Sequence, residues 1–213
     1  MAMLIDYKKE NKDLYLPGKE PSLIKVAAFN FVAVDGQGSP NEPDGEYKKA
    51  VEVLYGIEYT IKMSKKGAAV PEGYFDFVVP PLEGLWWLDD DKSDFRDKSK
   101  YKWISMIRLP EFVNKEVFDW AKNEAARKKK INTEKAYFFK YSEGLCVQCM
   151  HTGPFDTEPK TLAQMDIFIN ENKLEKDLSE KRKHHEIYLS NFLKIDPAKM
   201  KTVLRIPVKK RGS

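Results

Sequence analysis

The sequence has few cysteines and no long apolar run, and both features limit what the protein can be. No stretch approaches the ~20 consecutive apolar residues of a membrane-spanning helix. The N-terminal segment MAMLIDYKKE lacks the apolar centre of a secretory signal. With 213 residues, 42% of them hydrophobic, the chain is long enough to bury a full core. We therefore expect a globular, cytoplasmic protein with no membrane partner.

The chain holds only two cysteines and three histidines, and their spacing argues against a metal centre. Cys146 and Cys149 lie in a strand-like run, where residues three apart point to opposite faces. His184 and His185 are neighbours on an expected strand and also face apart, with no third ligand at a suitable spacing. We expect buried structural thiols, no metal and no cofactor.

Neither sign of charge dominates, because 37 basic and 33 acidic residues are mixed along the chain and leave a net charge of +4. The densest positive run, residues 127–130, ends an expected helix at about 111–130, where cations complement the helix dipole. No recognised nucleic-acid-binding motif accompanies this run. We therefore expect no nucleic-acid partner.

The order strand, helix, strand, strand occurs twice, within residues 20–110 and again within residues 136–210. The expected helix at 111–130 joins the two series. The closing strands match in five successive positions, Met-Ile-Arg-Leu-Pro at 106–110 and Val-Leu-Arg-Ile-Pro at 203–207. Such a match predicts an internal duplication.

Two modules of this kind predict an α+β fold with an antiparallel sheet and helices on one side of it. Each module has one sheet face that a helix covers and one that needs another cover. Packing the modules about a pseudo-twofold axis meets that need and leaves a central ligand cleft. We interpret residues 1–213 as a single domain built in this way.

The segment HHEIYL at 184–189 places a carboxylate in an expected strand. Alternation puts Glu186 and Tyr188 on one face and Ile187 and Leu189 on the other, which is the core face. Aligning the two repeats backward from their closing strands makes Trp87 the counterpart of Tyr188. A glutamate on an exposed edge strand would need no functional explanation, but the predicted cleft gives Glu186 a place to act.

Three segments carry a resemblance to a known family: residues 148–154 (QCMHTGP), 156–159 (DTEP) and 185–189 (HEIYL). Together with the duplicated plan they resemble the GyrI-like small-molecule-binding proteins, over nearly the whole chain. No helix-turn-helix region accompanies the effector-binding module, so we expect a stand-alone binder or enzyme. The resemblance implies a cleft lined with aromatic side chains and a glutamate that meets lipophilic ligands, which we assign to Glu186.

Some stand-alone members with a Trp-Trp segment are hydrolases that open the cyclopropane ring of DNA-alkylating natural products, the cyclopropanoid cyclopropyl hydrolases. The resemblance therefore implies an aromatic cage for a flat lipophilic ligand. Trp86 and Trp87 point to opposite faces, so one of them faces the cleft, and we favour Trp87. Large aromatic residues also serve as core, and Phe155 either forms a rim or staples a helix start. The candidate ligand contacts are Trp87, Trp103, Tyr55, Trp86 and Phe155.

For the reaction, we assign Glu186 as general base toward a water molecule and Tyr188 as the donor that stabilises the water or the developing oxyanion. The competing hypothesis is a binder that sequesters or senses drugs, in which Glu186 is a countercharge for a cationic ligand. A third hypothesis, docking to a macromolecular target, lacks a single-signed charged face. The sequence leaves open whether the protein is a monomer or a homodimer, and whether the loop at 89–100 is a lid or a solvated connection.

Overall fold

The structure is a computed structural model that describes residues 4–67, 70–89, 97–190 and 194–212. Residues 90–96, most of the loop for which the sequence leaves a lid or a solvated connection open, lie outside the described residues. The chain divides into two compact units that each combine distant segments. Unit 1 contains Met1–Asp6, Phe29–Pro80 and Trp87–Tyr141, and unit 2 contains Tyr7–Ala28, Pro81–Trp86 and Ser142–Ser213.

The helices and strands follow the duplicated order that the sequence predicts, with additional short elements. The helices are α1 (Tyr7–Glu10), α2 (Lys12–Tyr15), α3 (Glu46–Met63), α4 (Lys115–Lys129) and α5 (Glu158–Glu171), with 3-10 turns η1 (Ser64–Lys66), η2 (Lys98–Lys100), η3 (Phe155–Thr157) and η4 (Pro197–Lys199). The strands are β1 (Ser22–Gln37), β2 (Leu82–Trp87), β3 (Lys102–Arg108), β4 (Tyr137–Thr152), β5 (Leu174–Lys176), β6 (His184–Tyr188) and β7 (Lys201–Lys210).

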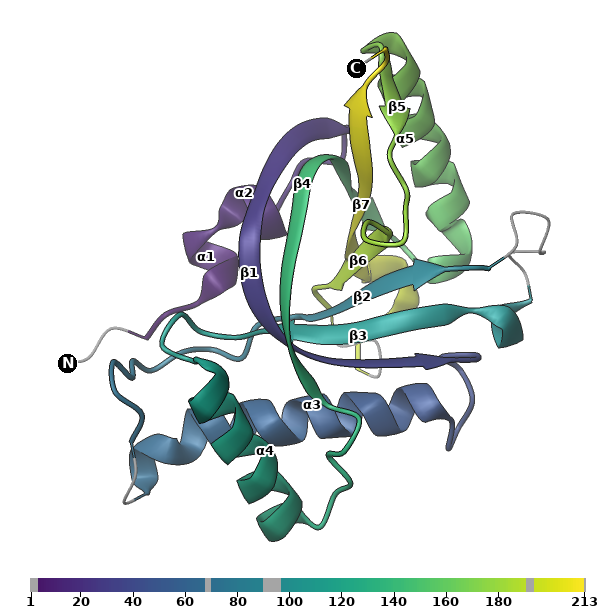
Figure 1. Ribbon diagram of the computed structural model, residues 1–213. Helices are drawn as coiled ribbons and strands as arrows, with labels where there is room; N and C mark the ends of the chain where they lie inside the picture. The colour runs from purple at the N-terminus through teal and green to yellow at the C-terminus, as the bar shows by residue number, and fades with distance from the viewer. Residues whose placement is uncertain (1–3, 68–69, 90–96, 191–193, 213) are drawn as a thin grey trace. The chain divides into compact units, whose positions relative to one another are not determined.

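In unit 1, β1 and β3 pair antiparallel, with Phe31 opposite Arg108 and Gly36 opposite Trp103. Helix α3 packs on β3, and α4 packs on α3 (Figure 1). Apolar side chains recur every three or four residues along α3 and form its buried face. They are Tyr47, Ala50, Leu54, Ile57 and Ile61.

Helix α4 begins four residues later than the sequence pattern predicts. The side chain of Asn114 accepts a hydrogen bond from the Val117 backbone N–H at 2.9 Å, which satisfies one of the unpaired donors of the first turn. The helix ends at Lys129, and Lys130 adopts a left-handed conformation with φ 56°. The Asn114 cap therefore sets the start of the helix at Lys115, whereas the sequence pattern had predicted a start at about residue 111.

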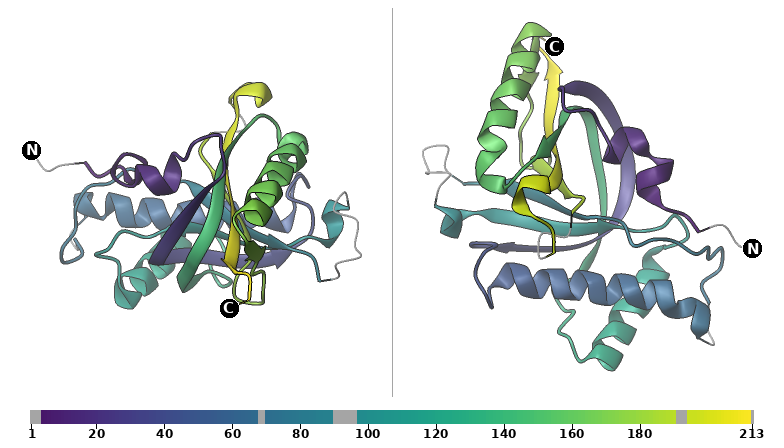
Figure 2. Two further views of the ribbon diagram at one scale, coloured as in Figure 1. Left: turned by 90° about the horizontal axis from the view of Figure 1, so that it is seen from above. Right: turned by 180° about the vertical axis from the view of Figure 1, so that it is seen from behind.

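In unit 2, β7 is the central strand, since it pairs antiparallel with β4, β5 and β6. Strand β2 pairs antiparallel with β6. Helix α5 lies beside β5 and β7 (Figures 1 and 2) and covers one face of β4 and β7. The core under α5 consists of Val147, Cys149, Met165, Ile169, Leu174, Leu204, Ile206 and Val208. The predicted α+β fold with antiparallel strands is confirmed.

The arginine that recurs in the two closing strands is buried in both units but has different partners. Arg108 lies with its guanidinium carbon 3.8 Å from the centre of the Phe29 ring and donates to Glu111 at 3.0 Å. Arg205 instead donates to Glu143 at 2.8 Å. The repeat thus preserves the residue while each unit uses it differently. In the part of the chain that the structure describes, no helix is both long and apolar enough to cross a membrane.

Candidate functional site

The paired strands β2 and β6 carry the residues around Glu186. Gly84 lies opposite Glu186, and Trp86 lies opposite His184. As the sequence pattern predicts, Glu186 and Tyr188 share one face while Ile187, only 1% exposed, takes the other. On the other side of β6, Glu186 lies opposite Leu204 of the core under α5. Since opposed residues in an antiparallel pair share a face, Glu186 stands on the side of the sheet that α5 partly covers.

Tyr188 links the Trp86 indole to the Glu186 carboxylate. Trp86 Nε1 donates to Tyr188 Oη at 2.8 Å, and Tyr188 Oη donates to Glu186 Oε2 at 2.8 Å. Both distances are typical of well-formed hydrogen bonds. The phenol therefore accepts from one partner and donates to the other, which fixes its orientation toward the carboxylate.

His184 approaches the second oxygen of the same carboxylate. Its Nε2 lies 3.2 Å from Glu186 Oε1, and the two side chains are 21% and 15% exposed. Both oxygens of Glu186 therefore have a neighbour, yet an ionised carboxylate offers about four acceptor positions, so each oxygen can accept a further bond. Sequence reasoning considered His184 only as a metal ligand and missed this contact. The spacing i, i+2 on a strand was the signal that could have found it.

Gly84 leaves the space in which the indole and the phenol meet. A Cβ atom at this position would lie 2.5 Å from Trp86 Nε1 and 3.0 Å from Tyr188 Oη. A glycine inside a strand often marks such a close approach. The hydrogen bond between Trp86 and Tyr188 thus depends on the absence of a side chain at Gly84.

Phe155 adds a second aromatic ring beside Tyr188. The ring centres are 5.9 Å apart and the planes are at 90°, an edge-to-face arrangement. Phe155 lies in η3, directly before α5. Trp86, Tyr188 and Phe155 therefore place three aromatic side chains next to a partly exposed carboxylate within unit 2.

The other predicted ligand contacts belong to unit 1. Trp103 is fully buried, and its ring packs edge-on against Tyr47 at 5.1 Å, which gives it the surroundings of a core residue. Tyr55 lies on α3, 6.2 Å from the ring of Tyr59, and burial raises its pKa. Trp87 is half-buried at the end of β2. That Trp87 faces the cleft stays a prediction, whereas Trp86, the less favoured of the two, donates a hydrogen bond to Tyr188.

On the opposite face of β6 lies a buried ion cluster of Glu83, Glu143, His185 and Arg205. His185 Nε2 is 2.9 Å from Glu83 Oε2, and His185 Nδ1 is 3.1 Å from Glu143 Oε1. Arg205 Nη1 donates to Glu143 Oε2 at 2.8 Å. The four side chains are at most 3% exposed. Two carboxylates thus face two cations, and the cluster is balanced in charge when His185 is protonated.

The electrostatics of the buried ion cluster keep His185 protonated at neutral pH. Burial alone would lower the pKa of His185, but the Glu143 and Glu83 carboxylates raise it to about 9. Burial alone would raise the pKa of Glu143, but His185 and Arg205 lower it to about 2. Because the cluster joins β2, β4, β6 and β7, it holds in place the strand that carries Glu186.

The cysteines have the buried, structural surroundings that the sequence predicts, and the surroundings of His151 are structural as well. Both thiols are buried and unlinked, and burial raises the pKa of Cys149 to about 11 and that of Cys146 further. His151 Nδ1 lies 2.9 Å from the Thr161 hydroxyl, and Nε2 lies 3.2 Å from the Pro154 carbonyl. Among the described residues, no three His, Cys, Asp or Glu side chains are grouped so that they could hold a metal ion.

Sites for small molecules typically combine aromatic side chains with a few precisely placed polar groups, and the residues around Glu186 form such a combination. The family model of the GyrI-like small molecule binding domain matches residues 19–209 of the chain. The chain belongs to this family of small-molecule-binding proteins.

Solved structures include close relatives. A hydrolase from Listeria innocua is 48% identical, with a TM-score of 0.88 over 96% of this chain and 100% of that chain. An uncharacterized conserved protein from Listeria innocua is also 48% identical, with a TM-score of 0.91 over 96% of this chain and 100% of that chain. The EcmrR C-terminal domain, 13% identical with a TM-score of 0.53, covers 90% of this chain and 98% of its own and shares the fold alone. No curated protein matches the chain.

Proposed function

We propose that the protein binds flat lipophilic aromatic compounds beside Glu186 and hydrolyses those that carry an activated cyclopropane. The observation that carries the proposal is the hydrogen-bonded chain from Trp86 through Tyr188 to Glu186. It orients a carboxylate that is 15% exposed among aromatic rings. Stacking on such rings contributes roughly 0.5–1.5 kcal/mol per pair beyond area burial and also orients a flat ligand.

In the proposed reaction, Glu186 accepts a proton from a water molecule, whose oxygen attacks a cyclopropane carbon. The attacked ring bond breaks, and its electron pair moves through the conjugated dienone onto the carbonyl oxygen, which becomes a phenolate. Tyr188 can turn its proton from Glu186 toward that oxygen as the charge develops. The phenolate then takes up one proton, from Glu186 directly or from solvent once Glu186 has released its own, so the product is the ligand plus one water.

Support for turnover comes from the solved relative at 48% identity that is named a hydrolase. The proposal is tested by incubating excess cyclopropane-bearing alkylator with the purified protein in H₂¹⁸O and following it by chromatography and mass spectrometry. The expected product carries one ¹⁸O, and many molecules form per protein. A mass increase confined to the protein itself would indicate alkylation of the protein and would contradict the proposal.

The alternative function is binding without turnover, in a protein that sequesters or senses drugs. The observation that favours it is the carboxylate of Glu186 hydrogen-bonded to Tyr188, which in turn bonds to Trp86, since a negative charge beside aromatic side chains suits a lipophilic cation. Saturable binding of such a cation, weakened by Glu186→Gln while the alkylator stays intact, would establish this function instead. Neither function requires a cofactor.

A further inference from the structure

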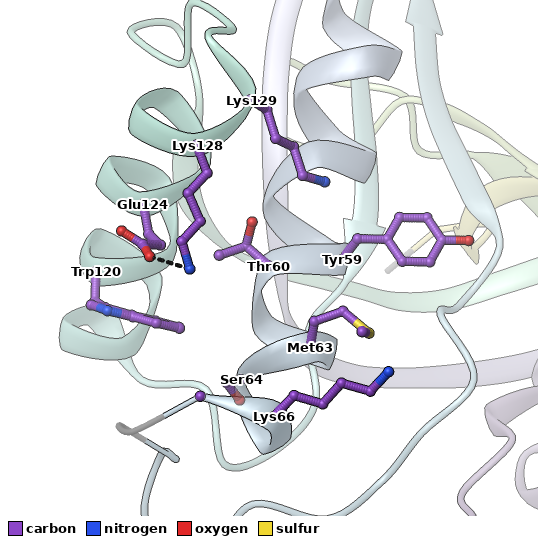
Figure 3. A pocket seen from close by; sticks show the side chains of 10 residues that line it. Tyr59, Thr60, Met63, Ser64, Lys66, Trp120, Glu124, Lys128 and Lys129 are labelled. Atoms are coloured by element: carbon purple, nitrogen blue, oxygen red, sulfur yellow. Dashed lines mark ion pairs between the residues drawn. The ribbon is translucent and has the colours of Figure 1, made fainter.

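A groove in unit 1 lies between α3 and α4, and its lining includes none of the residues described around Glu186. Its volume is about 550 Å³, within the range of small-molecule pockets. Tyr59 and Met63 line it from α3, and Trp120 lines it from α4 (Figure 3). Tyr59 is 46% exposed and Met63 is 42% exposed. The groove therefore presents an apolar and aromatic surface to solvent.

Two cations border this surface without an acidic partner. Lys66 and Lys129 line the groove, and neither forms an ion pair with any residue that the structure describes. Figure 3 shows the Lys129 side chain reaching from the end of α4 toward α3. Its ammonium lies 5.7 Å from the centre of the Tyr59 ring, and its partial burial lowers the pKa. The acidic residue of the groove, Glu124, is already paired with Lys128 at 2.6 Å and with Arg127 at 2.9 Å.

A buried hydroxyl adds a polar group with unused hydrogen-bonding capacity. Ser64 lines the groove and is 5% exposed, yet its Oγ has no hydrogen-bond partner among the described residues. A serine hydroxyl can both donate and accept a hydrogen bond, so Ser64 has capacity for a polar group of a ligand. By contrast, the neighbouring Thr60 hydroxyl already donates to the Gly56 carbonyl at 2.8 Å.

We infer that this groove is a second ligand site and that it takes a small amphipathic organic anion, an aromatic or acyl group that bears a sulfonate or carboxylate. The apolar part lies against Tyr59, Met63 and Trp120. The anionic group is neutralised by Lys129 and Lys66, and Ser64 donates or accepts a hydrogen bond. A purely apolar ligand would leave the two cations and the hydroxyl unused, and a cationic ligand would be repelled.

The test uses 8-anilinonaphthalene-1-sulfonate as the probe and N-phenyl-1-naphthylamine, the same ring system without the sulfonate, as its neutral match. Each is titrated by fluorescence into the full chain. We expect saturable binding of the sulfonate that Lys129→Met weakens by about 3- to 10-fold, as the loss of one partly desolvated charge contact implies. The neutral probe, which suits the site beside Glu186 as well, does not respond to Lys129→Met.

Two control variants make the result specific. Lys115→Met removes one positive charge from the same helix, at a side chain that pairs with Asp119, and should leave the probe affinity unchanged. Glu186→Gln should also leave it unchanged, which separates this groove from the proposed reaction site. Equal sulfonate affinities in Lys129→Met and Lys115→Met, the same response of both probes to Lys129→Met, or loss of the Lys129-dependent binding in Glu186→Gln would each overturn the inference. Thermal melting of each variant checks that it is folded.

Discussion

Replacing His185 by glutamine should remove a pH dependence of folding stability that the buried ion cluster creates. The folded pKa of His185 is about 9, above the value near 6.5 of an unfolded histidine. A group whose folded pKa is raised contributes its full stability below the unfolded pKa and loses it as pH rises through the folded one. The contribution is therefore complete at pH 6 and declines between about pH 6.5 and 9.

The magnitude follows from the same two pKa values, which correspond to about 3 kcal/mol of folding free energy. His185 is 2% exposed, so solvent screening does not reduce this figure. For a chain of this size, about 3 kcal/mol lowers the melting temperature by about 6–12 °C. Glu143 acts at the acid side: its folded pKa of about 2 gives stability that is present above about pH 4.5 and lost as pH falls toward 2.

The assay is urea unfolding followed by circular dichroism at several pH values from 6 to 9. Wild type should lose up to about 3 kcal/mol over this range, whereas His185→Gln should be less stable at pH 6 and change little with pH. His184→Gln changes a neighbouring side chain that is 21% exposed. In this variant the free energy of unfolding should decline with pH as it does in wild type. The same decline in wild type and in His185→Gln would refute the assignment of this pH dependence to His185.

Two further substitutions probe the residues around Glu186. Gly84→Ala places a methyl group where Trp86 Nε1 lies 2.5 Å away, so the indole must move. We expect a loss of about 1–3 kcal/mol in folding stability and at least about 10-fold weaker ligand binding. Ligand affinity that calorimetry finds unchanged would contradict the role of the glycine. Tyr188→Phe keeps the ring against Phe155 but removes the hydroxyl. The rate of hydrolysis should fall by about 10²–10³-fold, while ligand affinity stays within about threefold. Equal losses of hydrolysis rate and ligand affinity would indicate a structural role instead.

The order of helices and strands could be predicted because it depends on local patterns. Alternation identified β6, and the five matching positions that contain Arg and Pro, at 106–110 and 203–207, aligned β3 with β7. The short α1, α2 and β5 were missed, since they are three or four residues long and have no periodicity of their own. The interpretation of 1–213 as one domain, with repeats at 20–110 and 136–210 about a central cleft, stays a prediction.

Only those features of the candidate site that lie within a single strand could be predicted from the sequence. Alternation within β6 correctly put Glu186 and Tyr188 on one face. The choice between Trp86 and Trp87 depends on the register between β2 and β6, a pairing across about 100 residues that alternation in a single strand cannot fix. The buried ion cluster was missed for the same reason, because its four members come from four strands.

The general-base role of Glu186 is the central claim, and the most direct measurement compares alkylator hydrolysis by wild type and Glu186→Gln under saturating ligand. Glutamine keeps the size of the side chain and one acceptor oxygen for the Tyr188 hydroxyl but cannot take a proton from water. We expect the rate to fall by about 10²–10⁴-fold, with ligand affinity within about threefold of wild type. A rate within a factor of about two of wild type would contradict the account, since a general base typically contributes far more.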